Sequence, residues 1–119
     1  MKKIESTKFG SIEVEGKKYK HDIIVTVKGE IKKRKKGLSR KYFGTSHKVS
    51  KDEAEYIYEP AADKIVIGNG QYGRLSLSPE AEEFFNNKNI QVIKNKTPKA
   101  IEVFNSQKGK KIGVFHVTC

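Results

Sequence analysis

The sequence of 119 residues contains one cysteine, no tryptophan, three prolines and only three arginines among its 25 basic residues. A single cysteine excludes an internal disulfide and a zinc site built from several cysteines. No stretch approaches the roughly 20 apolar residues that a transmembrane helix needs, so we expect no membrane insertion. Residues 1–6 carry charges without an apolar run behind them. We therefore expect no secretory signal and a location in the cytoplasm.

What the sequence does contain is enough apolar material for one core. Hydrophobic residues make up 35% of the chain and charged residues 33%, and six Phe and five Tyr argue against disorder. Independent domains most often have about 100–150 residues. Because no repeat and no linker interrupts the chain, we expect residues 1–119 to form one domain.

The charge is positive and unevenly distributed. There are 25 basic and 14 acidic side chains, which gives a net charge of +11. Residues 1–50 hold 15 basic and 5 acidic groups, whereas residues 51–119 hold 10 and 9. A basic segment, residues 28–41, includes an unbroken run of cations. This run predicts contact with a polyanion such as nucleic acid, although a solvated loop is the simpler interpretation. The predicted contact residues are Lys32, Lys33, Arg34, Lys35 and Lys36.

Residues 1–49 have the pattern of a β-rich region. The turn Glu15-Gly16-Lys17 lies between apolar alternations and predicts a hairpin. Residues 22–28 form a dense β-branched run that predicts a strand. We expect Leu38, Tyr42 and Phe43 to anchor the basic segment onto the body of the domain.

Residues 50–119 alternate between helical and strand patterns. Ser50 and Glu53 form a capping box, and Ser78 and Thr97, each followed by proline, predict two further helix starts. Short apolar runs at residues 64–67, 90–93 and 111–117 predict strands. This order predicts an α/β fold: a single three-layer domain with a mixed central sheet, helices packed on it, and an N-terminal β-hairpin region.

A glycine loop follows the first of these strands. Gly68, Gly70 and Gly73 match the dinucleotide pattern G-x-G-x-x-G, but no helix opens at the loop and no acidic residue ends the next strand. We therefore predict no dinucleotide and no other cofactor. The loop lies where open α/β sheets bind ligands, and its N–H groups are expected to face a partner. With Tyr72 as an aromatic anchor and His47 as a titratable neighbour, the predicted binding residues are His47, Gly68, Gly70, Tyr72 and Gly73.

No catalytic motif is present. Ser46 precedes His47 without the context of a nucleophile elbow, and His116 and Cys119 have a spacing that places strand side chains on opposite faces. We assign no catalytic residue and no metal ligand. An enzyme that gathers His47, His116 and Cys119 near the glycine loop is an alternative, with Cys119 as a nucleophile activated by a histidine.

In these same segments the chain resembles a family of small archaeal and bacterial conserved proteins of unknown function, related to the adipogenesis-associated human protein and a mitochondrial complex I assembly factor. The resemblance spans nearly the whole chain. It rests on Phe9-Gly10, Gly44-Thr45-x-His47, Val66-Ile67-Gly68-x-Gly70, the two Pro-started helices, and the ending Gly113-Val114-Phe115-His116-x-Thr118-Cys119.

The resemblance implies a single α/β domain with a mixed sheet, no established catalytic activity and no cofactor. Its eukaryotic members are discussed as assembly or regulatory proteins that act through other proteins. We therefore predict a conserved protein of unknown function that is a non-enzymatic binding or assembly module with protein partners. The small enzyme near His47 and residues 68–73, and nucleic-acid binding through residues 28–41, are the alternatives. The sequence assigns no oligomeric state.

Overall fold

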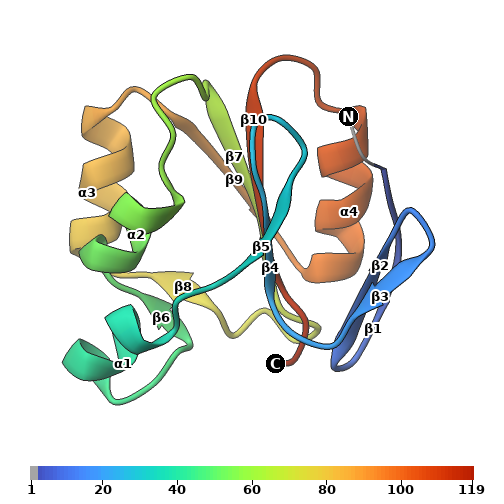
Figure 1. The fold of residues 1–119 in the computed structure, drawn as a ribbon. Helices are drawn as coiled ribbons and strands as arrows, with labels where there is room; N and C mark the ends of the chain where they lie inside the picture. The colour runs from blue at the N-terminus through green and yellow to red at the C-terminus, as the bar shows by residue number, and fades with distance from the viewer. Residues whose placement is uncertain (1–2) are drawn as a thin grey trace.

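The computed structural model describes residues 3–119 and is built around a five-stranded mixed sheet (Figure 1). The three C-terminal strands of this sheet are parallel to one another, and the two N-terminal strands are antiparallel to their neighbours. This confirms the mixed sheet that the alternating pattern predicts. In spatial order the strands are β5 (Ile31–Lys33), β4 (Ile23–Val25), β10 (Lys111–His116), β7 (Lys64–Asn69) and β9 (Gln91–Asn95).

Helices cover both faces of the sheet and make three layers (Figure 1). One face carries α2 (Lys51–Ile57) and α3 (Pro79–Asn87). The other face carries α4 (Thr97–Ser106) and a small antiparallel sheet. That sheet consists of β1 (Ile4–Lys8), β2 (Ser11–Val14) and β3 (Lys17–Tyr19), and the elements α1 (Gly37–Phe43), β6 (Lys48–Val49) and β8 (Ser76–Leu77) lie at one end of the molecule.

Side-chain alternation in the central strands feeds two cores. In β7, Ile65 and Ile67 point into the cluster under α2 and α3, while Val66 points into the cluster under α4. In β10, Val114 and Phe115 divide in the same way. Because both faces are covered, these strands consist of nearly continuous apolar residues.

Local signals explain the predicted turn and two of the helix starts. Glu15 and Gly16 have φ of 47° and 82°, so both central residues of the β2–β3 hairpin are left-handed, as a tight two-residue turn requires. The Ser50 hydroxyl accepts the Glu53 N–H at 3.1 Å, and the Ser78 hydroxyl accepts the Ala81 N–H at 3.1 Å. These contacts confirm the hairpin and both serine caps.

One local prediction is wrong and another is confirmed only in part. Thr97 is not a side-chain cap: its Oγ1 donates to the His116 carbonyl at 2.6 Å and accepts the Gly70 N–H at 2.9 Å, and Lys96 occupies the N-cap position. Of the three predicted anchors of the basic segment, Leu38 is half-buried, whereas the rings of Tyr42 and Phe43 in α1 have exposed fractions of 58% and 37%. Tyr42 contacts the body of the domain through its hydroxyl, which donates to Asp52 Oδ2 at 2.8 Å. Helix α1 itself carries no strong sequence signal.

Candidate functional site

The glycine loop lies at the carboxyl edge of the sheet, where β7, β9 and β10 all end. Its backbone faces the last residues of the chain. The N–H of Gln71 donates to the Thr118 carbonyl at 2.7 Å, and the N–H groups of Tyr72 and Arg74 donate to the Cys119 carbonyl at 3.1 and 3.0 Å. These N–H groups, which the glycine pattern predicts to face a partner, are hydrogen-bonded within the chain.

The glycines permit this close approach. Gly70 has φ of 108°, and a Cβ at this position would lie 2.2 Å from the carbonyl carbon of Cys119. A Cβ at Gly68 would lie 2.9 Å from Thr97 Oγ1. Gly73 has φ of 73°, a conformation that side chains disfavour. Glycine is therefore required at Gly70 for the approach to Cys119, at Gly68 for the contact with Thr97, and at Gly73 for its left-handed backbone.

His47 and the glycine loop meet at a common neighbour, His116. The His47 and His116 rings pack edge to face with centroids 5.4 Å apart, and a Cβ at Gly70 would lie 2.9 Å from His116 Cδ2. The structure thus brings His47 to the region of the loop, as the sequence predicts. Partial burial lowers the pKa of His47, and the nearby His116 and Arg74 charges lower it further.

His116 is itself part of a buried hydrogen-bond network. Its Nδ1 N–H donates to Asp22 Oδ2 at 2.7 Å, and its Nε2 lies 3.3 Å from Thr118 Oγ1. The order carboxylate, imidazole and hydroxyl resembles a catalytic triad in outline. However, the exposed fraction of His116 is 1%, so a substrate in solvent does not reach the imidazole. The arrangement holds the C-terminal residues and the strand before them in place.

One residue of the basic run, Arg34, belongs to the same buried hydrogen-bond network. The Arg34 guanidinium donates to both oxygens of Glu53 at 2.6 and 2.8 Å and to Asp22 Oδ2 at 2.9 Å, and its side chain is fully buried. Ser39 donates to the same Glu53 carboxylate at 2.6 Å. Arg34 is therefore an internal ion-pair residue, which removes it from the surface on which a polyanion contact is predicted.

The predicted capping box at Ser50 and Glu53 forms only in part. The Ser50 hydroxyl accepts the Glu53 N–H, but the Glu53 carboxylate binds Arg34 and Ser39.

The contacts within the network keep the Asp22 carboxyl ionised. Burial raises the pKa of the Asp22 carboxyl, but contacts from His116, the Val117 N–H and Arg34 outweigh burial and hold that pKa well below its usual range. Burial lowers the pKa of Arg34, but the two carboxylates raise it above the ordinary arginine value. One sign of this cluster is visible in the sequence: a lone acid, Asp22, directly before a buried apolar run.

The remaining cations of the run divide between two sides of the chain. Lys32 and Lys35 place their ammonium groups 4.1 and 4.6 Å from the centre of the Tyr56 ring. The Tyr56 hydroxyl donates to the Lys33 carbonyl at 3.2 Å. Lys33 and Lys36 instead line a pocket of about 370 Å³ beside His21. The run is therefore not one continuous basic surface.

An exposed aromatic pair lies beside the glycine loop. Phe9 and Tyr72 have exposed fractions of 58% and 67%, and their rings pack with centroids 6.1 Å apart. The turn of Phe9 and the loop of Tyr72 are tied together, because the Gln71 side chain donates to Thr7 Oγ1 at 3.0 Å. The Gly10 N–H also donates to the Val117 carbonyl at 2.7 Å. The glycine loop in the sequence indicates Tyr72, but no pattern there pairs it with Phe9, which lies far from it in the chain.

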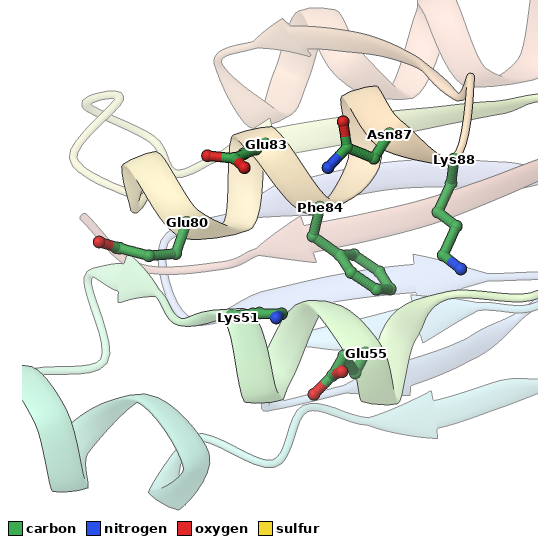
Figure 2. A pocket seen from close by; sticks show the side chains of 7 residues that line it. All are labelled: Lys51, Glu55, Glu80, Glu83, Phe84, Asn87 and Lys88. Atoms are coloured by element: carbon green, nitrogen blue, oxygen red, sulfur yellow. The ribbon is translucent and has the colours of Figure 1, made fainter.

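Besides the pocket beside His21, a hollow lies between α2 and α3, the helices on the sheet face opposite α4 (Figure 2). It has a volume of about 390 Å³, and the Phe84 ring points from α3 towards α2 at its base. Acidic and basic side chains both stand around it, and no sequence motif indicates it. The lining residues are Lys51, Glu55, Glu80, Glu83, Phe84, Asn87 and Lys88.

Between residues 3 and 119, no helix is long and apolar enough to cross a membrane. Over that range, no group of three or more His, Cys, Asp or Glu side chains is placed to hold a metal ion.

Comparison with known proteins places this arrangement in a family. Residues 4–115 match the model of a family described as "Protein of unknown function (DUF498/DUF598)". The chain belongs to the DUF498/DUF598 family. The family model thus confirms a conserved family of unknown function. No curated protein matches the chain.

Several solved structures have the same fold as this chain. The chain is similar to the conserved hypothetical protein PH1505 from Pyrococcus horikoshii OT3, with 35% identity, a TM-score of 0.92, and coverage of 98% of this chain and 99% of that one. It is similar to a protein called MT938, with 29% identity, a TM-score of 0.85 and full coverage of both chains. It shares the fold of a Bordetella pertussis protein described as a Mth938-like domain, with 13% identity, a TM-score of 0.64, and coverage of 98% and 85%.

Proposed function

We propose that this DUF498/DUF598 protein is a non-enzymatic binding module that contacts a partner protein through Phe9 and Tyr72. The observation that carries the proposal is the exposure of both rings on a surface that the chain holds rigidly. Monomeric proteins place large aromatic rings inside when they can, and aromatic side chains supply much of the energy at protein interfaces. Two paired rings at the carboxyl edge of the sheet form a small apolar centre for an interface.

The surroundings of the pair define the chemistry of the partner. Three basic side chains lie near the pair. Lys8, next to Phe9, and Arg74, two residues after Tyr72, are both exposed. The Lys96 side chain lies close to the loop, 3.7 Å from where a Cβ added to Gly73 would be. The chain as a whole carries a charge of +11. We therefore expect an acidic protein segment that presents an apolar side chain to the Phe9–Tyr72 pair, because complementary charge guides association.

Rigidity makes the surface suitable for binding. The loop that carries Tyr72 is hydrogen-bonded to the last two residues of the chain, and the turn that carries Phe9 is bonded to the residue after β10, Val117. A partner therefore does not have to order either ring's backbone on binding. A preorganised surface loses less entropy in association than a mobile one.

The wider relationships are part of the same proposal. We infer that the chain is related to the adipogenesis-associated human protein and to the mitochondrial complex I assembly factor, which are discussed as acting through other proteins. Their particular roles are not carried over to this chain. A cytoplasmic location is also proposed, because one cysteine in 119 residues fits a reducing compartment.

The test is affinity capture from a lysate of the native organism, with and without nuclease. The double variant Phe9→Ser/Tyr72→Ser is compared with Tyr42→Ser/Phe43→Ser, which removes the other exposed aromatic pair, with ring centroids 6.3 Å apart. We expect the first variant to lose a nuclease-resistant protein partner while its Tm stays close to that of the wild type. Capture that survives in the first variant, or that is lost equally in both, would contradict the proposal.

A further inference from the structure

We propose that the pocket between the end of β5, the residues before β4 and the start of α1 binds the phosphate group of a small phosphorylated molecule. The pocket has a volume of about 370 Å³, within the range of small-ligand sites. It shares no residue with the Phe9–Tyr72 pair and is independent of that proposed function. The side chains that line it are His21, Asp22, Lys33, Arg34, Lys36 and Arg40.

The charges in the wall of the pocket do not cancel. Asp22 is the one acid in the lining, and its carboxylate already binds Arg34, His116 and the Val117 N–H. Arg34 is in turn neutralised by Glu53. Asp22 and Glu53 carry two negative charges against one on Arg34, and Lys36, which pairs with Asp22, balances the second. The excess of positive charge around the hollow therefore comes from Lys33 and Arg40, which line it together with Lys36.

Two of these cations have no competing acid. In the described chain, residues 3–119, neither Lys33 nor Arg40 forms a salt bridge, and both are exposed. Lys36 keeps its ammonium 3.5 Å from Asp22 Oδ2, which holds that side chain at the pocket. An arginine fork gives a phosphate two parallel hydrogen bonds, and lysines add point charges. Together these groups match a phosphate dianion.

The fourth basic group is held in a fixed orientation. The His21 Nδ1 N–H donates to the carbonyl of Asp22 at 2.9 Å, and its ring packs edge to face against Tyr19 with centroids 5.8 Å apart. This leaves Nε2 as the ring nitrogen that can meet a ligand. Because Nδ1 is the donor, Nε2 of the neutral ring is an acceptor, and it can accept a hydrogen bond from a hydroxyl group of the phosphorylated molecule beside the phosphate.

The division of the basic run favours one compact anion over a polynucleotide. Each strand of a DNA duplex presents a phosphate about every 3.4 Å along the helix axis, so the surface that binds it is a stripe of cations. Here Lys32 and Lys35 bind the Tyr56 ring, while Lys33 and Lys36 line the pocket. The cations that converge therefore form a cluster around one point.

The test is a titration of ¹⁵N-labelled protein with inorganic phosphate and with a sugar phosphate, at ionic strength matched with sodium chloride. We expect saturable amide shifts centred on the pocket residues. Lys33→Ser/Arg40→Ser should weaken the affinity about a hundredfold, which is the loss expected for two charge-assisted contacts that each contribute about tenfold or slightly more. The matched control Lys32→Ser/Lys35→Ser removes the same charge from the same segment and should bind as the wild type does.

Three results would overturn the proposal. The first is that phosphate gives no saturable shift beyond that of chloride. The second is an equal loss of affinity in both double variants, which would show general charge attraction. The third is a short single-stranded oligonucleotide that binds more tightly than the sugar phosphate and loses affinity in both variants, which would assign the run to nucleic acid.

Discussion

Replacement of Asp22 by asparagine tests the buried ion cluster most directly. The Asp22 carboxylate accepts from His116 at 2.7 Å, from Arg34 at 2.9 Å and from the Val117 N–H at 2.9 Å. An asparagine keeps one acceptor oxygen and turns a donating NH₂ group towards at least one of these donors. The change also leaves the Arg34 guanidinium with one carboxylate where it had two.

The expected loss is large because the site is buried. Removal of one partner from a buried ion pair costs about 3–5 kcal/mol, against a total stability of about 5–15 kcal/mol for a typical domain. At about 4 °C per kcal/mol for a chain of this size, the Tm should fall by roughly 12–20 °C. Urea unfolding at pH 7 measures this loss. The control Asp52→Asn removes an acid from a solvent-exposed pair with Lys41 and should change the stability little.

The pH dependence gives a second readout with a definite sign. Because the folded state holds the pKa of Asp22 well below its usual range, the unfolded chain takes up this proton first. The stabilisation from Asp22 is therefore complete above the unfolded pKa of about 3.9 and declines as the pH falls below that value. The Asn variant should lack this part of the acid decline. A variant within about 1 kcal/mol of the wild type at pH 7, with an unchanged acid profile, would refute the reasoning.

The remaining predictions concern the carboxyl edge and the pH response of His47. Gly70→Ala should destabilise the fold by about 3 kcal/mol or more, because φ is 108° and the added Cβ meets the backbone of Cys119 at 2.2 Å. Gly37→Ala, which meets open space in α1, should be neutral or stabilising by about 0.5 kcal/mol in the same urea assay. For His47, a lowered folded pKa means that the unfolded state binds the proton more tightly, so stability is full above about pH 6.5 and falls as the pH drops below it. His47→Gln should remove that part of the decline, and equal pH profiles between about pH 5 and 7 would contradict it.

Much of the fold follows from local patterns because those patterns act over a few residues. The hairpin at residues 15–16 needs two left-handed positions, and Glu15-Gly16 supplies them. The caps at Ser50 and Ser78 each require one hydroxyl three residues before an N–H, which is a spacing visible in the sequence. The strand at residues 64–67 is recognisable because both of its faces are buried.

The site is less predictable because its parts are distant in the chain. Phe9 pairs with Tyr72, and Asp22 binds His116 across 94 residues. Tyr72 and His47 carry signals of their own, an aromatic ring in a glycine loop and a titratable side chain near it. Phe9 and Asp22 carry only weak signals of a site, since a phenylalanine at a turn and an acid before a strand are common surface residues.

By itself the sequence determined the α/β class, the hairpin, the two serine-capped helices and the excess of basic residues, because each depends on composition or on contacts within a few residues. Only the tertiary structure decided what the distinctive segments do. The glycine loop binds the chain's own last residues, since β7 and β10 are parallel neighbours whose ends meet. Arg34 is buried because it binds two acids, Glu53 and Asp22, that come from other elements of the fold. Its lysine neighbours divide between the Tyr56 ring and the pocket beside His21. A run of basic residues indicates that acidic groups will bind there. Which acidic groups lie within reach depends on how distant segments pack against the run.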